Sequence, residues 1–115
     1  MMCWKEEWAY AIRDINKAIK HVKRAQEKPE KRRDRAKKHY RKLSKDKKHG
    51  TAKELAAVQA IIDKNTSGIA RCLLIVNNLR YQQQNLRTLI EELGINSTSS
   101  GSEKVRKILE ETFAP

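Results

Sequence analysis

Glycine, proline and cysteine are scarce in this chain, and each scarcity excludes a class of protein. Four Gly and two Pro in 115 residues leave few places for turns, which argues against a β-sandwich or an enzyme built from many loops. Cys3 and Cys72 are too few for a disulfide framework, so each is expected as a free thiol. Because charged residues make up 35% of the chain and hydrophobic ones 38%, long solvated helices are expected instead.

Long hydrophobic runs are also missing. No segment approaches the roughly 18–20 consecutive apolar residues that a membrane span requires. The first residues, MMCWKEE, lack the apolar core of a signal peptide, which predicts a cytoplasmic or nuclear protein and not a secreted one. A chain of this length is expected to form a single helical domain, residues 1–115, with a modest core.

Residues that catalytic or metal sites require are not grouped. His21, His39 and His49 are far apart in the sequence, and no cysteine or carboxylate stands at metal-binding spacing from them. The acidic pairs of the second half have the positions of helix-surface acids, and no glycine-rich phosphate loop is present. The sequence therefore predicts no enzyme, no cofactor, no metal ion and no small-molecule substrate.

The clearest pattern is an apolar heptad repeat in the second half of the chain. Alternating steps of three and four give Leu55, Val58, Ile62, Asn65, Ile69, Cys72, Val76, Leu79, Gln83, Leu86, Ile90 and Leu93. Ten of these twelve are apolar, which predicts a helix over 51–93. Gly50 is expected to end the preceding helix in a left-handed conformation, and Thr51 with Glu54 is expected to form a capping box at the start of this one. Residues 64–68 are weak helix formers, and we expect the helix to continue through them, with a turn as the alternative.

A weaker stripe in the first half predicts a helix over 2–48. Its apolar positions step by four and three through Trp4, Trp8, Ala11, Ile15, Ala18, Val22 and Ala25, with Ile12 and Ile19 widening the stripe, and after Pro29 through Ala36, Tyr40 and Leu43. Proline removes a backbone donor and clashes with the preceding turn, so we expect a kink or a split at Pro29.

Two helices of similar length joined near Gly50 predict an all-α, coiled-coil-like antiparallel hairpin, in which residue i lies opposite roughly residue 99 − i. Pro29 then falls beside Gly68, so both helices are weakest at one level, as in a hinge. A linker over 94–101 leads to a short helix over 102–113, which packs Val105, Ile108, Leu109 and Phe113 at the Trp4 and Trp8 end. The expected result is a three-helix base and a basic two-helix arm.

Positive charge is concentrated in that arm. Eleven of the 26 Lys and Arg lie in residues 29–50, against three acids, in a chain of net charge +12. A helix places most of these cations away from the apolar side, which predicts a folded cationic face and not a disordered tail. Tyr40, inside the segment, either packs against Gln59 or presents its ring to a ligand. The candidate binding residues are Lys31, Arg35, Lys38, Arg41, Lys42, Lys45 and Lys48.

Cations repeated at about one turn suit the phosphates of a nucleic acid. With almost no Asn or Gln, the face has few groups suited to reading base edges, so its contacts are expected to be to phosphates. We therefore expect sequence-independent binding, with double-stranded RNA preferred over DNA. The layout is similar to that of small viral proteins that sequester double-stranded RNA on paired helices, although no motif identifies a family. An oligomeric coiled-coil adaptor for another helical protein, and a peripheral binder of anionic membrane, are the alternatives.

The apolar arc of helix 51–93 is too wide for one neighbouring helix. Small residues on the first helix cover little of it, so Ile61, Leu73, Ile75 and Leu89 are predicted to remain partly exposed in a monomer. Soluble monomers rarely leave such a patch uncovered, and a two-fold dimer forming a helical bundle would bury it. The sequence therefore predicts a homodimer through these four residues, with Asn65 and Gln83 helping to set its register.

Overall fold

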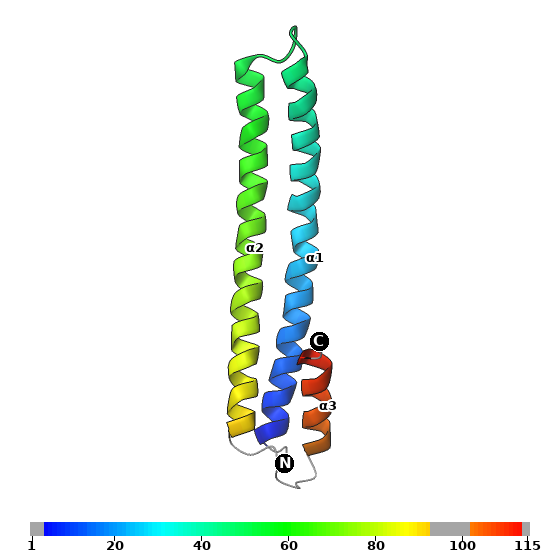
Figure 1. The fold of residues 1–115 in the computed structure, drawn as a ribbon, viewed down its shortest axis with the longest axis vertical. Coiled ribbons are helices and arrows are strands. Elements are labelled where there is room, and N and C mark those ends of the chain that lie inside the picture. The colour runs from blue at the N-terminus through cyan, green and yellow to red at the C-terminus, as the bar shows by residue number, and fades with distance from the viewer. Residues whose placement is uncertain (1–3, 93–101, 114–115) are drawn as a thin grey trace. The chain divides into compact units, whose positions relative to one another are not determined.

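The computed structural model describes residues 4–92 and 102–113, and all of its regular structure there is helical. Helix α1 spans Trp4–Lys45, α2 spans Ala52–Glu92 and α3 spans Ser102–Phe113 (Figure 1). The chain is thus a helical hairpin followed by a short C-terminal helix, as predicted. The expected linker over 94–101 lies outside the described residues.

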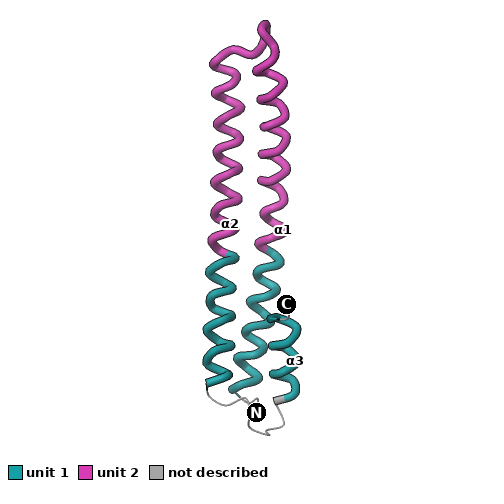
Figure 2. The backbone as a smooth tube through the Cα atoms, in the orientation of Figure 1, with its two compact units in different colours: residues 1–21, 76–115 teal, residues 22–75 magenta. Residues whose placement is uncertain are grey.

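The chain divides into two compact units (Figure 2). The three-helix unit comprises residues 1–21 and 76–115, and the hairpin unit comprises residues 22–75. The first contains the start of α1, the end of α2 and all of α3. The second contains the remainder of α1 and α2 with the turn that joins them.

The core of the three-helix unit combines side chains from all three helices. Ile12, Ile90 and Val105 are fully buried, one from each helix. Around them pack Trp8, Leu86, Leu109 and Phe113, among other residues. Helix α3 therefore buries the apolar face that the sequence predicts, and it packs that face against the Trp8 end of α1.

A smaller cluster forms the core of the hairpin unit. Ala36 of α1 packs with Val58 and Ile62 of α2, and Tyr40 and Leu43 lie half-buried against them. Leu43 thus shares a cluster with Val58, as the register of 99 − i predicts. The register also predicts that Pro29 of α1 lies beside Gly68 of α2. A Cβ added at Gly68 would lie 3.8 Å from the Cβ of Pro29, so the two residues are neighbours.

The predicted seam of α2 is confirmed. Every one of its heptad positions from Leu55 to Ile90 is buried or half-buried, including the two polar ones. Gln83 donates a 2.9 Å hydrogen bond from Nε2 to the backbone carbonyl of Ile12, and Asn65 donates a 2.8 Å bond from Nδ2 to the carbonyl of Ile61. Both residues therefore belong to the seam of the hairpin, and their role in the register of a dimer stays a prediction.

Helix α2 runs without a break through residues 64–68. Two side chains of this segment bond back to the carbonyl four residues earlier: Asn65 to Ile61, and Thr66, from Oγ1, to Ile62 at 2.8 Å. Such side-chain bonds are compatible with a continuing helix. The turn considered as the alternative does not form.

The prediction for α1 was partly wrong. Its buried side is centred on Ala9, Ile12 and Ile19, whereas Ala25 is exposed. Trp4 remains 39% exposed and packs edge-to-face on Trp8, with ring centroids 5.0 Å apart. Ile12 and Ile19, which the sequence placed at the margin of the stripe, are at its buried centre, because isoleucine buries more apolar area than the alanines counted as seam positions.

Pro29 does not split α1, which is a single helix of 42 residues. The helix ends at Lys45, three residues before the predicted end. Asp46 accounts for the early stop, because its Oδ1 accepts the backbone N–H groups of Lys48, at 2.9 Å, and His49, at 3.2 Å. An aspartate that bonds to the backbone just ahead favours a turn over a helix.

Gly50 and Thr51 connect the turn to α2. The sequence predicts a left-handed backbone at Gly50, but the structure requires glycine there for a different reason. A Cβ would clash with the carbonyl oxygens of Leu43 and Asp46, which approach Gly50 closely. Thr51 Oγ1 accepts the N–H of Glu54 at 3.2 Å, which is one of the two bonds of the predicted capping box. The N–H of Thr51 itself donates to the carbonyl of His49.

Candidate nucleic-acid interface

Seven cations form one straight row on the side of α1 away from the seam. Steps of four and three place one side chain per turn on the same face of the helix. All seven are exposed and all lie in the hairpin unit: Arg24, Lys28, Lys31, Arg35, Lys38, Lys42 and Lys45. This cationic stripe extends over roughly 30 Å at 1.5 Å per residue.

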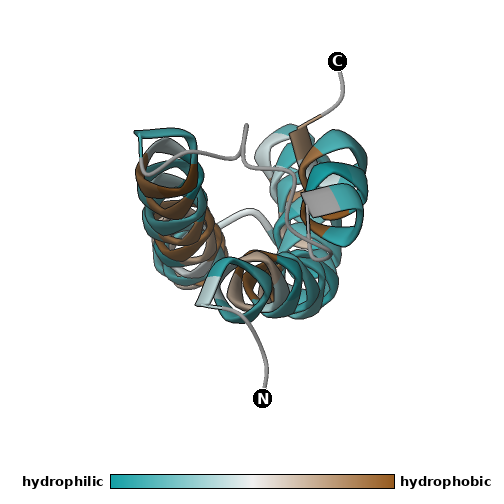
Figure 3. Ribbon diagram, turned by 90° about the horizontal axis from the view of Figure 1, so that it is seen from below, coloured by the Kyte–Doolittle hydropathy of each residue, from teal (hydrophilic) through white to brown (hydrophobic). Residues whose placement is uncertain are grey.

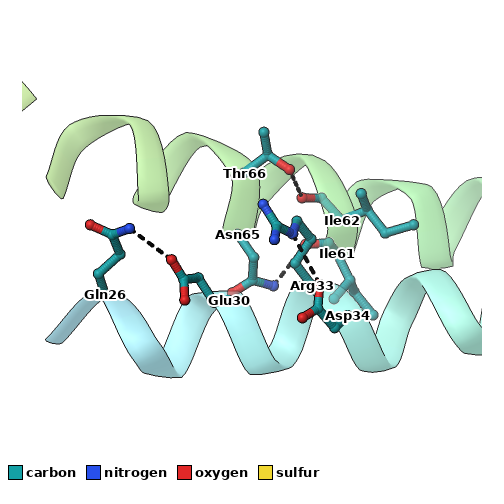
Figure 4. A network of polar contacts seen from close by, with 8 residues as sticks. All are labelled: Gln26, Glu30, Arg33, Asp34, Ile61, Ile62, Asn65 and Thr66. Carbon is teal, nitrogen blue, oxygen red and sulfur yellow. Dashed lines mark hydrogen bonds and ion pairs between the residues drawn. The ribbon is translucent and has the colours of Figure 1, made fainter. Parts of the chain in front are cut away.

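The acids of the same segment, Glu27, Glu30, Asp34 and Asp46, form no ion pair with a stripe cation in the described residues. Glu30 accepts a 2.7 Å hydrogen bond from Gln26, and Asp34 pairs with Arg33 at 3.3 Å (Figure 4). Asp46 is held by the backbone of the turn. In the part of the chain that the structure describes, no stripe cation has an ion pair with a carboxylate.

Neighbouring charges of the stripe therefore repel one another. Their average separation along the helix axis is about 5 Å, which is shorter than the Debye length of about 8 Å at physiological ionic strength. Salt at that concentration screens the repulsion only in part. An anion with several charges along its length would relieve it.

A hollow on the stripe gives such an anion a position. It has a volume of about 390 Å³ and lies near the end of α1. Its lining brings together three stripe cations and His39, with Leu43 and Asp46 completing it: Arg35, Lys38, His39, Lys42, Leu43 and Asp46. Donors of Arg and Lys grouped in this way can hold a phosphate group.

The structure places the predicted binding residues in two groups. Lys31, Arg35, Lys38, Lys42 and Lys45 belong to the cationic stripe. Arg41 lies to one side of it, with its Nε 3.5 Å from the carbonyl of Lys37. Lys48 is in the turn and not on the helix.

Sequence reasoning missed Arg24 and Lys28. Both precede Pro29, where the dense basic segment begins, so a search by charge density passes them over. The step of four and three that defines the apolar seam also reaches them, and applying it to the cations would have found them.

Beside the stripe, a second hollow of about 270 Å³ contains Tyr40. Gln59 and Ile62 of α2 line it together with Tyr40, Lys37 and Arg41 of α1. The ring of Tyr40 is half-buried against the apolar cluster and at the same time borders a space next to two cations. It therefore packs in the core and remains within reach of a ligand bound there.

The exposed face of α2 has the opposite character. All four predicted oligomer residues are exposed, and so are Leu74 and Tyr81, which the sequence analysis did not single out: Ile61 50%, Leu73 49%, Leu74 62%, Ile75 47%, Tyr81 69% and Leu89 41%. Coloured by hydropathy, α2 shows apolar residues repeatedly along its length, whereas α1 is mostly hydrophilic (Figure 3). In the hairpin unit this follows because α1 is the single neighbouring helix there and covers only the seam of α2.

Other kinds of site are not evident in the described ranges. Residues 4–92 and 102–113 contain no group of three or more His, Cys, Asp or Glu that could hold a metal ion. Within the same ranges, no helix is long and apolar enough to cross a membrane. Cys72 is a free thiol.

Comparisons of this chain with protein-family models, with curated proteins and with solved structures find no match. The functional argument therefore rests on the cationic stripe and on the exposed face of α2.

Proposed function

We propose that the chain binds nucleic acid through the cationic stripe, prefers double-stranded RNA, and sequesters the duplex. The observation that carries this proposal is the row of seven exposed cations without carboxylate partners in the described chain. A phosphate backbone supplies regularly spaced charges of the opposite sign, and binding it releases condensed counterions. The stripe lacks the Asn and Gln that pair with adenine and presents its cations as one regular row, which favours contacts to phosphates over contacts to bases.

Double-stranded RNA suits the stripe better than DNA does. A row of cations on one helix recognises the shape and backbone of a duplex, and RNA duplexes are bound mainly through shape, phosphates and 2′-hydroxyls. Five or six phosphate contacts predict a slope of about −5 for log affinity against log salt, on the scale known for DNA.

A binding comparison of duplex RNA, duplex DNA and single strands at fixed salt tests the proposal. Replacing Lys38, Lys42 and Lys45 with Glu should lower the affinity for duplex RNA roughly 100-fold or more, since three contacts become repulsive. The matched control replaces Lys104, Arg106 and Lys107 of α3, which are also exposed, and changes the net charge equally. Circular dichroism of both variants checks that helix content is unchanged.

Equal losses of RNA affinity in the two triple variants would show that only net charge matters, and would contradict the stripe as the binding site. A salt slope near zero, or strong preference among unrelated sequences, would contradict phosphate recognition. Binding to anionic vesicles, with none to duplexes, would favour the membrane alternative.

The exposed apolar face of α2 favours a second function, as an adaptor for another helical protein. Leu73, Leu74 and Ile75 point to different sides of the helix and are all about half exposed or more. A helix that is apolar all round is normally buried. A pull-down that recovers the same protein partner after nuclease treatment would support the adaptor.

A homodimer through α2 is part of the same proposal. An interface requires accessible residues, and the predicted interface residues are exposed: Ile61, Leu73, Ile75 and Leu89. Two copies would present two cationic stripes to one duplex and raise the avidity without new contacts. Light scattering at micromolar concentration distinguishes a dimer from the 13.4 kDa monomer.

A further inference from the structure

The hollow that contains Tyr40 is formed by both helices of the hairpin unit, and the cationic stripe does not account for it. Lys37, Tyr40 and Arg41 line it from α1, and Gln59 and Ile62 line it from α2. Its two cations are not members of the stripe, although each is next in sequence to a stripe lysine. At roughly 100° per residue, both lie between the stripe and the seam of α1.

Part of the lining is apolar and belongs to the core of the hairpin unit. Ile62 is a buried member of the cluster with Ala36 and Val58, and the ring of Tyr40 lies half-buried against the same cluster. Both side chains are thus held by packing before any ligand arrives. A flat ring that enters the hollow can bury apolar surface there without first ordering its binding site.

The amide of Gln59 adds a fixed hydrogen-bonding group to the lining. Its Nε2 donates a 2.9 Å bond to Oδ1 of Asp63, one turn further along α2. This bond engages the amino end of the amide and orients the side chain. Oε1, at the other end, remains an acceptor for an N–H group of a ligand.

The cations of the hollow can hold a phosphate group. Arg41 donates from Nε to the backbone carbonyl of Lys37 at 3.5 Å, and its terminal amino groups remain as further donors. Among the described residues that line this hollow none is acidic, whereas Asp46 lines the hollow on the stripe. An anion beside Lys37 and Arg41 therefore meets positive charge without a competing carboxylate in the lining.

We propose that this hollow binds one unpaired nucleotide of an RNA whose duplex lies on the cationic stripe. The base packs against Tyr40 and Ile62, and an N–H group on its edge donates to Oε1 of Gln59. Lys37 and Arg41 hold the adjoining phosphate. The inference rests on the proposed function and adds to it a preference for duplexes that carry an overhang or a bulge.

The size of the hollow restricts it to a single nucleotide. Its volume of about 270 Å³ is slightly below the roughly 300–1,000 Å³ of sites for drug-sized ligands. A paired base cannot enter, because its faces are covered by neighbouring pairs and its edge by its partner. An unpaired base has neither restraint, and proteins commonly stack such bases on aromatic side chains.

The chemistry of the lining does not select a base sequence. Each of the four bases has a flat face and at least one N–H group on its edge, so a ring and a single acceptor accommodate any of them. The hollow therefore separates unpaired from paired nucleotides. This agrees with the sequence-independent binding proposed for the stripe.

Three RNA duplexes with identical base pairs test the inference: a blunt duplex, one with a single unpaired 3′ nucleotide, and one whose overhang is an abasic sugar phosphate. At fixed salt, the chain should bind the overhang roughly fivefold or more tightly than the blunt end, the range expected for one stacked base. The abasic overhang has the same phosphate but no base, and it should bind like the blunt duplex.

Equal affinity for the three duplexes would overturn the inference. If all three also bind with a steep salt dependence, the stripe as a duplex site is unaffected. If none binds, the proposed function fails together with the inference.

Two variants assign the preference to the hollow. Tyr40→Leu removes the ring but keeps apolar bulk against the cluster, and Gln59→Ala removes the acceptor at an exposed position where the fold does not depend on it. Each should lower the ratio of overhang to blunt affinity to about one. Gln84→Ala removes another exposed carboxamide of α2, outside the hollow, and should leave the ratio unchanged. A ratio that survives in both hollow variants would overturn the site.

Crosslinking locates the base without relying on affinity. A 4-thiouridine placed as the unpaired nucleotide and irradiated in the complex should attach to a peptide containing Tyr40 or Gln59. Tyr81 is the natural competitor, since it is an aromatic side chain of α2 with 69% exposure. Adducts at Tyr81, with none at the hollow, would place the base elsewhere and contradict the proposal.

Discussion

The two compact units differ in how completely they bury their cores. In the three-helix unit, Ile12, Ile90 and Val105 have no measurable exposure. In the hairpin unit, each of the three buried cluster residues retains 8% exposure: Ala36, Val58 and Ile62. Two helices alone cannot surround a side chain, whereas a third helix closes the remaining side.

The difference indicates a division of labour along the chain. The three-helix unit contains most of the well-buried apolar residues, and the hairpin unit carries the cationic stripe and the exposed apolar face of α2. A unit with a small core and repelling charges opens at lower cost than one with a closed core. Ligand binding to the stripe, or a second copy on α2, would stabilise the hairpin unit by mass action.

Truncating one core residue in each unit should show the largest difference in stability between the two units. Ile90→Ala in the three-helix unit should cost about 4 kcal/mol of unfolding free energy, because a closed core cannot fill the cavity. Ile62→Ala in the hairpin unit should cost about 2 kcal/mol, since its site is open to water on one side. Urea unfolding measures both, and equal losses would mean that the units are equally well packed.

Replacing Pro29 tests the weak point of the hairpin unit. Pro29→Ala restores the missing backbone donor inside α1 and should raise stability by about 1–3 kcal/mol. Native-state hydrogen exchange should slow at amides near position 29 and remain unchanged at those near Ile12. A loss of stability would instead show that the contact of Pro29 with Gly68 outweighs the strain.

A smaller effect is expected at the cap of α2. Thr51→Ala removes the oxygen that accepts the N–H of Glu54 and should cost about 1 kcal/mol. Thr51→Ser keeps this bond and should remain within a few tenths of a kcal/mol of the original chain. Thermal unfolding of the two variants decides the matter, and identical midpoints would show that water replaces the cap.

Much of the fold was predictable because the apolar heptad of α2 has few alternatives. Its seam, the antiparallel register and the buried face of α3 all agree with the structure. The prediction was weaker for α1, whose alanines are apolar without being large. Counting apolar positions there placed Ala25 in the seam, although it is exposed.

The candidate site was predictable in part. Five of the seven predicted cations lie on the stripe, because charge density marks that segment. Charge density does not show where α1 ends, so Lys48 was assigned to the cationic face of the helix. The turn at Asp46 ends the helix before it reaches Lys48. Charge density also does not reveal Arg24 and Lys28, which precede Pro29 and so lie outside the segment of highest charge density.

The sequence by itself determined the helices, their pairing and the side of α1 on which positive charge collects, because each follows from spacing at the helical period. Spacing also predicted that Ile61, Leu73, Ile75 and Leu89 stay partly exposed, and only the tertiary structure added Leu74 and Tyr81 to them. Leu73, Leu74 and Ile75 differ little from buried neighbours such as Val76 in hydrophobicity. They lie between the seam positions Cys72 and Val76 and point to other sides of α2, which a single neighbouring helix does not cover.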